Sequence, residues 1–366
     1  MLIRTLMLAV ALAFGAPALA QSAQDPTVFD KDWDIVSIGD ELRFALGVRD
    51  GEAGLLNLNT GSLRLIARTI HPYDEATLIR RSPDGNKVAI ATTRTLHIFD
   101  LNEGRYSPQA LGARVIDMAW DASSTALAYW QDNRILSVYP LDHTMGLEDR
   151  DIAGQLALLA DGWQRPYVLG ATAEQAVAMD FRTGLVGPAS PVMQPRIRDI
   201  VAFADGSAVL LGNRLAFETA GDFLFEYDSR HYVRAAWPSM ASADVLFYDE
   251  TGQLSRVDLE RHEPQWSHTV RDLGALWTAE DLSLLVLSVN RPPREGEQRG
   301  YGELVILDGQ TGNYLWGTLD APGFSHQAVR LSADGCALIA ARDLVEGASE
   351  TVFVSWDLSG RSPTCL

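Results

Sequence analysis

The sequence is dominated by an internal repeat of about 42 residues. An acidic turn between two short apolar segments recurs eight times, at Asp40, Asp84, Asp121, Asp161, Asp205, Asp244, Asp281 and Asp334. A second turn follows later in most units, in forms such as "DLNEG" (100–104) and "DGQTG" (308–312). Short β-rich segments with this period are typical of a β-propeller, in which each repeat forms one four-stranded blade. We therefore expect an all-β propeller of eight blades, with seven as the alternative if one degenerate unit is not a blade.

The two ends of the chain are expected to close the ring together. The last unit, residues 327–358, supplies only three strands, whereas "PTVFD" (26–30) precedes the first strand of the first unit. This N-terminal strand would complete the last blade and leave no long free edge.

The only two cysteines, Cys336 and Cys365, lie near the C-terminus. In an oxidising compartment an even number of cysteines favours pairing. A disulfide between them would close a loop of 29 residues and stabilise the fold by roughly 3–4 kcal/mol on the chain-entropy description. Two unpaired thiols are the alternative.

Residues 1–20 have the organisation of a cleaved signal peptide. Arg4 is followed by an apolar segment, residues 5–16, and then by the small-residue sequence "ALA" at 18–20, which is typical of a cleavage site. The apolar segment is shorter than the roughly twenty residues that a spanning helix needs. We expect an exported protein of the Gram-negative periplasm, with residues 21–366 forming a single propeller domain and no membrane span.

The formal net charge of −18 limits the classes of partner. Nucleic acids and anionic membrane surfaces are bound through basic patches, so neither is expected as a ligand. A strongly acidic surface favours solubility, and we expect a monomer that binds another protein.

Several motifs resemble a known family. The turns "SPDG" (82–85) and "DLNEG" (100–104), and the segment "VILDGQTGNYLW" (305–316), are similar to those of WD40-like and quinoprotein-like propellers of exported bacterial proteins. The resemblance covers nearly all of the chain after residue 20. It implies that Trp316 and Trp266 each pack against the adjacent blade. Some members of these families hold a redox cofactor and others bind only proteins.

Two sets of polar residues are candidates for the mouth of a central channel. His231, His268 and His326 are expected in or beside connections between blades, where imidazoles bind metal or haem or brace the blades by hydrogen bonding. Four aspartates, each close to an arginine, are expected at the start of inner strands: Asp117, Asp151, Asp199 and Asp272. Such carboxylates coordinate a cation or form structural ion pairs, and we favour the structural interpretation for both sets. Trp120, Trp237 and Trp277 occupy matching positions before the acidic turn and are expected to pack between blades.

Two insertions interrupt the repeat, at residues 290–302 and 342–351. Both lengthen the loop between the middle strands of a unit, so they should project from the same face of neighbouring blades. Long loops in a compact repeat are often functional. The first insertion supplies the candidate partner-binding residues: Arg291, Arg294, Glu295, Glu297, Arg299 and Tyr301. Surface decoration without function is the alternative.

No nucleophile elbow or phosphate-binding glycine loop is present in the sequence. The leading hypothesis is therefore a non-catalytic periplasmic propeller that binds a protein partner through its loop-rich face, without a cofactor. The alternative is a subunit of a quinoprotein or amine-dehydrogenase-like enzyme, or a metal-dependent lactonase, with a quinone or a divalent metal at the channel mouth. A third possibility is binding of a small molecule or haem in the channel without turnover.

Overall fold

The computed structural model describes most of the chain from Pro26 onwards. The described ranges are 26–67, 78–141, 148–151, 158–163, 167–172, 175–180, 183, 185–186, 199–202, 207–211, 215–219, 222–227, 231, 233–261, 263–293, 299–320, 323–344, 350–359 and 365. The expected signal peptide, residues 1–20, lies outside them.

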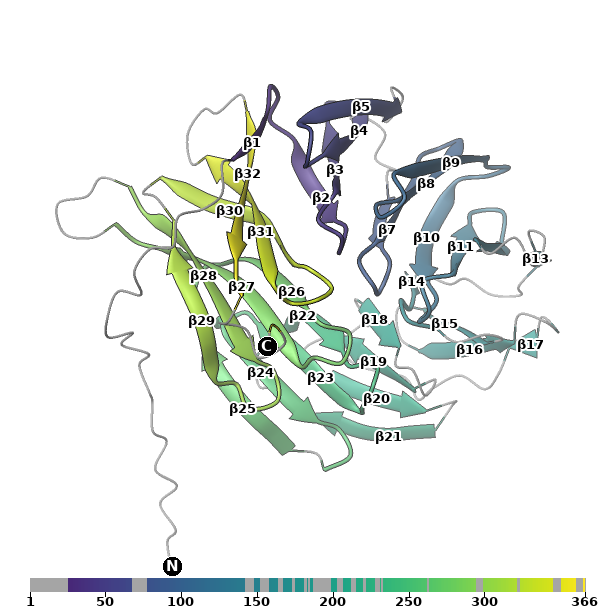
Figure 1. Ribbon diagram of the computed structural model, residues 1–366. Helices are drawn as coiled ribbons and strands as arrows, with labels where there is room; N and C mark the ends of the chain where they lie inside the picture. The colour runs from purple at the N-terminus through teal and green to yellow at the C-terminus, as the bar shows by residue number, and fades with distance from the viewer. Residues whose placement is uncertain are drawn as a thin grey trace, which may run out of the picture.

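Every regular element in these ranges is a β-strand, and the strands pair into eight four-stranded sheets. The sheets are arranged around a common axis, with the first strand of each sheet innermost and the fourth outermost (Figure 1). The structure is thus an all-β propeller, as the repeat predicts. We number the sheets 1 to 8 in chain order.

The first four sheets follow the chain without crossing over. Sheet 1 comprises β2 (Asp34–Ile38), β3 (Phe44–Arg49), β4 (Glu52–Asn57) and β5 (Ser62–Ala67). Sheet 2 comprises β6 (Leu78–Arg81), β7 (Lys87–Ala91), β8 (Thr95–Asp100) and β9 (Arg105–Ala110). Sheet 3 comprises β10 (Val115–Trp120), β11 (Ala126–Gln131), β12 (Ile135–Pro140) and β13 (Glu148–Asp151). Sheet 4 comprises β14 (Leu158–Leu159), β15 (Tyr167–Ala171), β16 (Ala176–Asp180) and β17 (Leu185–Val186).

The remaining sheets repeat this order until the last one. Sheet 5 comprises β18 (Asp199–Ala202), β19 (Ser207–Leu211), β20 (Leu215–Thr219) and β21 (Asp222–Tyr227). Sheet 6 comprises β22 (Val233–Pro238), β23 (Asp244–Asp249), β24 (Gln253–Asp258) and β25 (Glu263–Thr269). Sheet 7 comprises β26 (Leu273–Thr278), β27 (Leu284–Arg291), β28 (Tyr301–Asp308) and β29 (Tyr314–Leu319). Sheet 8 comprises β30 (Phe324–Leu331), β31 (Ala337–Leu344), β32 (Thr351–Asp357) and β1 (Thr27–Phe29).

Apolar side chains between consecutive sheets hold the ring together. Shared hydrophobic clusters join sheet 1 to sheet 2, 2 to 3, 3 to 4, 6 to 7, 7 to 8 and 8 back to 1. Contacts of β18 with β14 and with β22 place sheet 5 between sheets 4 and 6. Because both faces of a sheet are covered, a middle strand such as β11 is buried along its whole length, which explains the apolar runs in place of strict alternation.

The N-terminal strand closes the ring, as the sequence predicts. β1 pairs antiparallel with β32, with Thr27 opposite Phe353 and Phe29 opposite Thr351. Phe29 is buried, and its ring meets that of Phe353 edge-on at 5.8 Å. The hydroxyl of Thr351 accepts a hydrogen bond from the N–H of Trp33 at 2.6 Å. The connection from β1 to sheet 1 is therefore fixed against sheet 8.

The loops of the ring emerge on two opposite faces. The hairpin between the second and third strands and the connection after the fourth strand lie at one end of each sheet, because the strands are antiparallel. We call this end, which includes the described parts of the two insertions (290–293, 299–302, 342–344 and 350–351), the hairpin face. The opposite end carries the turns between the first two and the last two strands, including Asp84 and Asp308, and we call it the turn face.

Hydrogen bonds connect successive acidic turns on the turn face. The N–H of Asp40 in sheet 1 donates to Asn86 Oδ1 in sheet 2 at 2.9 Å, and the N–H of Asp84 donates to Ser124 Oγ in sheet 3 at 3.2 Å. At the closure of the ring, the N–H of Ala333 in sheet 8 donates to the carbonyl oxygen of Asp40 at 3.3 Å. The repeated acidic turns therefore hold neighbouring sheets together.

Tryptophans pack between sheets, as expected. The indole N–H of Trp120 donates to the carbonyl oxygen of Arg80 in the preceding sheet at 3.1 Å. Trp316 belongs to a cluster shared by sheets 7 and 8, and the indole of Trp266 donates to the carbonyl oxygen of Gly309 in sheet 7 at 2.8 Å. These contacts confirm that the tryptophans after the later turn pack against the adjacent sheet.

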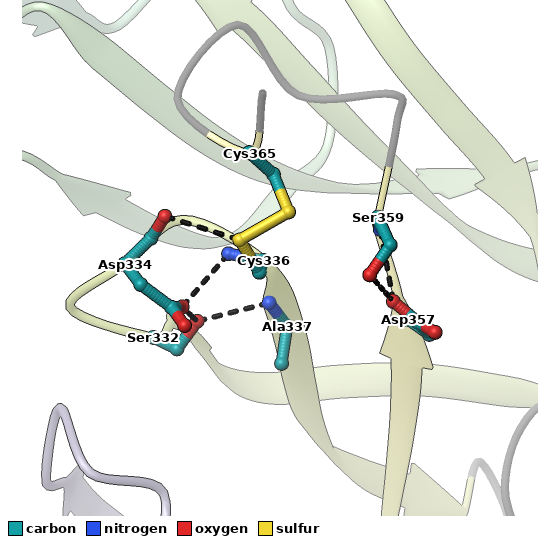
Figure 2. The surroundings of a disulfide bond; sticks show 7 residues. All are labelled: Ser332, Asp334, Cys336, Ala337, Asp357, Ser359 and Cys365. Atoms are coloured by element: carbon teal, nitrogen blue, oxygen red, sulfur yellow. Dashed lines mark hydrogen bonds between the residues drawn. A yellow bond between two sulfur atoms is a disulfide. The ribbon is translucent and has the colours of Figure 1, made fainter.

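The disulfide between Cys336 and Cys365 is present (Figure 2). It links Cys365 to the first turn of sheet 8, on the turn face. Asp334 shapes that turn by accepting hydrogen bonds from Ser332 Oγ at 2.5 Å and from the N–H of Cys336 at 2.9 Å. These two hydrogen bonds lower the pKa of the Asp334 carboxyl.

Candidate functional site

The hairpin face is most developed on sheets 7 and 8. β27 and β28 each have eight residues, whereas the corresponding strands of sheet 2, β7 and β8, have five and six. β31 in sheet 8 also has eight residues. The extended ends of these strands lie on neighbouring sheets at the same side of the ring (Figure 1). The sequence prediction that the two insertions share one face is confirmed for their described parts.

The stem of the first long hairpin is an ordered two-stranded ladder. Asn290 pairs with Gly302 and Arg291 with Tyr301, two pairs beyond the end of the regular sheet. Arg291 Nε donates to Glu303 Oε2 at 2.5 Å, which reinforces the stem with a half-exposed ion pair. Pro292, which follows Arg291, is exposed and restricts the backbone where the loop leaves the ladder.

The connection after β29 also supports this stem. The N–H of Asp320 donates to the carbonyl oxygen of Gly302 at 2.9 Å, and the N–H of Gly323 donates to the carbonyl oxygen of Gly300 at 2.7 Å. The Arg299 side chain lies over Gly323, so that a Cβ added there would come within 3.1 Å of Arg299 Cδ. Gly323 has a φ of 92°, which a side chain at this position would disfavour.

A buried polar chain lies directly beneath the two hairpins. Ser288 Oγ is 3.0 Å from His326 Nδ1, and His326 Nε2 is 3.0 Å from Asp320 Oδ2. Asp320 is paired on both carboxylate oxygens with Arg342, whose Nε is 2.6 Å from Oδ2. The Arg342 guanidinium also stacks over the Phe324 ring at 4.5 Å from its centroid.

These Ser–His–Asp contacts do not make Ser288 an accessible nucleophile. Ser288 lies in the middle of β27 with 0% of its surface exposed, and His326 is 2% exposed. A catalytic serine has to reach a substrate, and this hydroxyl is enclosed by packed strands. The buried polar chain therefore serves to position the segments that it joins.

The candidate partner-binding residues divide into two groups. Arg299 is exposed, whereas Arg291 and Tyr301 are half-buried in and beside the stem. Arg294, Glu295 and Glu297 lie outside the described residues. The structure brings the described members to one end of one hairpin.

Asp117 is a structural residue. Its carboxylate accepts hydrogen bonds from Arg80 Nη2 at 2.6 Å and from the N–H of Leu159 at 2.8 Å. The three residues belong to β6, β10 and β14, so the contact joins the inner strands of three consecutive sheets. Burial raises the pKa of Asp117 above its usual value, although Arg80 and the backbone N–H of Leu159 act in the opposite direction.

The expected position at the start of an inner strand is confirmed for Asp199 and is wrong for Asp151. Asp151 is the last residue of β13, an outermost strand, opposite Ile135. Asp199 opens the inner strand β18, whereas Asp272 is exposed in the connection before β26, with a φ of 57°. A repeated Arg-Asp pair therefore marks several different positions of the fold.

His268 and His326 lie near the ends of strands β25 and β30, beside connections between sheets, as the sequence predicts. A ring nitrogen of His268 is 2.8 Å from the carbonyl oxygen of Gly312 in the next sheet, which fits the bracing role. His231 lies beside β22, half-exposed, with Nδ1 4.0 Å from Glu250 Oε1. His231 and His268 both belong to the region of sheet 6, whereas His326 lies in sheet 8, and the three histidines make separate contacts.

Neither metal nor membrane features are found in the described ranges. No group of three or more His, Cys, Asp or Glu side chains there has the arrangement that a metal ion requires. The same ranges contain no helical segment with the length and hydropathy needed to cross a bilayer.

Comparisons with known proteins identify the fold. No protein-family model and no curated protein matches the sequence. Among solved structures, the chain is similar to the C-terminal WD40 domain of Sif2, with a TM-score of 0.61 and 12% identity over 89% of this chain and 97% of that one. It is also similar to the computationally designed Ika8 protein, with a TM-score of 0.62 and 15% identity over 89% and 96% of the two chains.

A third similar structure is a chain of the mitotic checkpoint complex, with a TM-score of 0.53 and 14% identity over 76% of this chain and 86% of that one. At these identities the similarity concerns the fold alone. Together with the ring of four-stranded sheets, it shows that this chain has a WD40-like β-propeller fold.

Proposed function

We propose that this protein is an exported, non-catalytic propeller that binds a protein partner through the long hairpins of sheets 7 and 8. The observation that carries the proposal is the pair of extended hairpins on adjacent sheets of the hairpin face, with the first stem fixed by an ion pair and by the connection after β29. Propellers of the WD40 type commonly present such faces to other proteins.

The composition of the first hairpin supports a binding role. Arginine and tyrosine are enriched where protein interfaces contribute most of their energy, and Arg291, Arg299 and Tyr301 lie at the end of one rigid stem. A stem that is already ordered before binding loses less conformational entropy when a partner docks. The exposed Pro292 and Pro293 restrict the loop further.

The cellular setting is part of the proposal. The signal-peptide pattern of residues 1–20 and the disulfide between Cys336 and Cys365 are both consistent with an oxidising compartment. We place the protein in the periplasm of a Gram-negative bacterium, as a monomer whose residues 21–366 form one domain.

Site-specific photo-crosslinking in the cells that make the protein tests the binding face. A photoreactive amino acid is placed at Arg299 or Glu350 on the hairpin face, and at the exposed Gln310 on the turn face as a control. We expect one and the same protein to be crosslinked from positions 299 and 350, to be displaced by excess purified protein, and to be absent from position 310.

Two outcomes contradict the proposal. The first is a lack of specific crosslinks at 299 and 350, or equal crosslinking from 310. The second is a stoichiometric quinone or divalent metal in protein purified from its own source, measured by absorbance and elemental analysis, which would support the enzyme alternative.

A further inference from the structure

The two long hairpins belong to different sheets, so something has to set their relative position. The first is continuous with β27 and β28, and the second begins at the end of β31. The four members of the buried chain lie on four segments: Ser288 on β27, Asp320 in the connection after β29, His326 on β30 and Arg342 on β31. The buried polar chain therefore connects the strand that carries the first hairpin to the strand that carries the second.

The chemistry of the buried polar chain sets the direction of the hydrogen bond between His326 and Asp320. Asp320 forms a salt bridge with Arg342, so its carboxylate accepts hydrogen bonds only. His326 Nε2 must then donate to Asp320, and Nδ1 shares the second hydrogen bond of the ring with the Ser288 hydroxyl. Each contact fixes the orientation of the next group along the chain.

Burial makes each of these contacts costly to lose. The His326 and Asp320 side chains are 0% and 3% exposed, and that of Arg342 is 17% exposed. A buried polar group without its partner costs about 1–3 kcal/mol, and more if it is charged. A sliding movement of one hairpin relative to the other would break at least one of these contacts, so the arrangement resists it.

The stem of the first hairpin rests on this chain. The His326 ring lies so close to Gly302 that a Cβ added there would be 2.6 Å from it. Asp320, the centre of the chain, also holds the stem through its backbone, by donating to the carbonyl oxygen of Gly302. On the side of the second hairpin, Arg342 is held between Asp320 and the Phe324 ring.

We propose that Ser288, His326, Asp320 and Arg342 form a positioning device that locks the stem of the first long hairpin and the β31 base of the second into one fixed arrangement. Its importance for partner binding rests on the proposed function, but the lock itself is a property of the protein alone. A partner would then meet both hairpins in a fixed arrangement.

Distances between spin labels test the lock on the whole protein. Labels are attached to R299C and E350C, with the native disulfide kept oxidised. We expect a single narrow distance distribution for the parent protein, and loss of that narrow distribution in His326→Gln and in Asp320→Asn. The backbone N–H groups of Asp320 and Gly323 should also exchange faster with solvent in both variants, because the stem opens.

The matched control is His97→Gln, which removes another buried histidine with a hydrogen-bonded ring, in sheet 2. It should leave the narrow distribution unchanged. If His326→Gln does not fold, Ser288→Ala provides the milder variant, because it removes one hydroxyl and should broaden the distribution less. Two results would overturn the lock. The first is an unchanged distance distribution in Ser288→Ala and in the His326 or Asp320 variant. The second is a broadening in His97→Gln that equals the broadening in those variants.

The two proposals can fail separately. A narrow distance in a protein that gives no crosslinks at 299 or 350 would refute the binding function and keep the lock. Normal crosslinking together with a broad distance distribution in the parent protein would refute the lock and keep the binding function.

Discussion

Arg330 Nη2 donates a hydrogen bond to the carbonyl oxygen of Asp84 at 2.8 Å, although 246 residues separate them. Arg330 lies in sheet 8 and Asp84 in sheet 2, so the contact reaches past sheet 1, where the ring closes. The same guanidinium contacts Asn86 Oδ1 at 3.2 Å and stacks on Trp277 of sheet 7. Burial lowers the pKa of Arg330, whereas Asp40, Asp84 and Glu280 favour its charge. Gly85, with a φ of 71°, provides the space that the guanidinium needs.

Replacing Arg330 should weaken the closure of the ring. We expect Arg330→Met to lower the free energy of unfolding by about 2–4 kcal/mol, because buried acceptors lose their donor and nearby carboxylates lose their counter-charge. Urea denaturation measures the change. Arg105→Met is the control, because Arg105 pairs with Glu103 at the surface and should change stability by less than about 0.5 kcal/mol. Equal effects in the two variants would contradict the stabilising role of Arg330 at the ring closure.

Removing the disulfide should destabilise the C-terminal end of sheet 8. We expect the double variant with Cys336→Ser and Cys365→Ser to lose about 3 kcal/mol of unfolding free energy, because its unfolded chain is no longer constrained by the cross-link. The midpoint of urea denaturation reports the loss. A reductant should shift the parent protein in the same direction and leave the double variant unchanged. A parent protein that is insensitive to the reductant would refute this prediction.

The buried His97 predicts a loss of stability in acid. Its Nδ1 is 2.9 Å from the Tyr106 hydroxyl, and burial lowers the pKa of His97 below its usual value. The unfolded chain takes up a proton near about pH 6.5, whereas the folded chain resists it. The stability that depends on neutral His97 is therefore complete above this pH and is lost as the pH falls through the lowered pKa.

Urea denaturation between neutral and mildly acidic pH checks this dependence. The unfolding free energy of His97→Gln should vary less over this range than that of the parent protein. The variant His231→Gln, which changes an exposed histidine, should keep the parent profile. An identical slope in the parent protein and in His97→Gln would show that His97 does not contribute to acid sensitivity.

A strained surface turn offers a stabilising substitution. Arg134 is exposed, between β11 and β12, with a φ of 68°. Residues other than glycine pay about 1 kcal/mol or more for this conformation. We expect Arg134→Gly to raise the unfolding free energy by about 0.5–1 kcal/mol, as measured by thermal or urea denaturation. Arg105→Gly in strand β9 should instead lower it, because glycine weakens a strand. A loss of stability in Arg134→Gly would contradict the argument.

The propeller fold was predictable because its signal is repeated. Turn residues such as Asp84 and Asp334 return at a fixed period, and each one reports on the same local geometry. The N-terminal strand was predictable by elimination, because the last unit lacks a fourth strand. Leu42 and Leu282 show the limit of this approach. Both adopt the left-handed conformation that Gly85 and Gly335 adopt in equivalent turns, and their side-chain packing favours leucine there.

The polar sites were less predictable because their residues meet across sheets. A local Arg-Asp pair does not reveal which strand it occupies: Asp199 opens the inner strand β18, whereas Asp151 ends the outermost strand β13. His326 was identified from its place near a connection, but Ser288, Asp320 and Arg342 follow no spacing that a motif could capture. Their contacts depend on how sheets 7 and 8 pack. The long insertions were the one local signal that pointed to this part of the fold.

The pairing of β1 with β32 has a consequence for how the chain reaches its native state. The first described strand cannot pair until nearly the whole chain is available, so this contact has one of the largest sequence separations that the chain permits. Contacts of this kind slow folding, because loop-closure entropy is lost before they form. Until then, Ile35 in sheet 1 and Ile339 in sheet 8 lack the interface that buries them. A ring that is closed by strands from both ends of the chain is therefore expected to fold late and cooperatively. Removing either β1 or β32 would break the same closing contact.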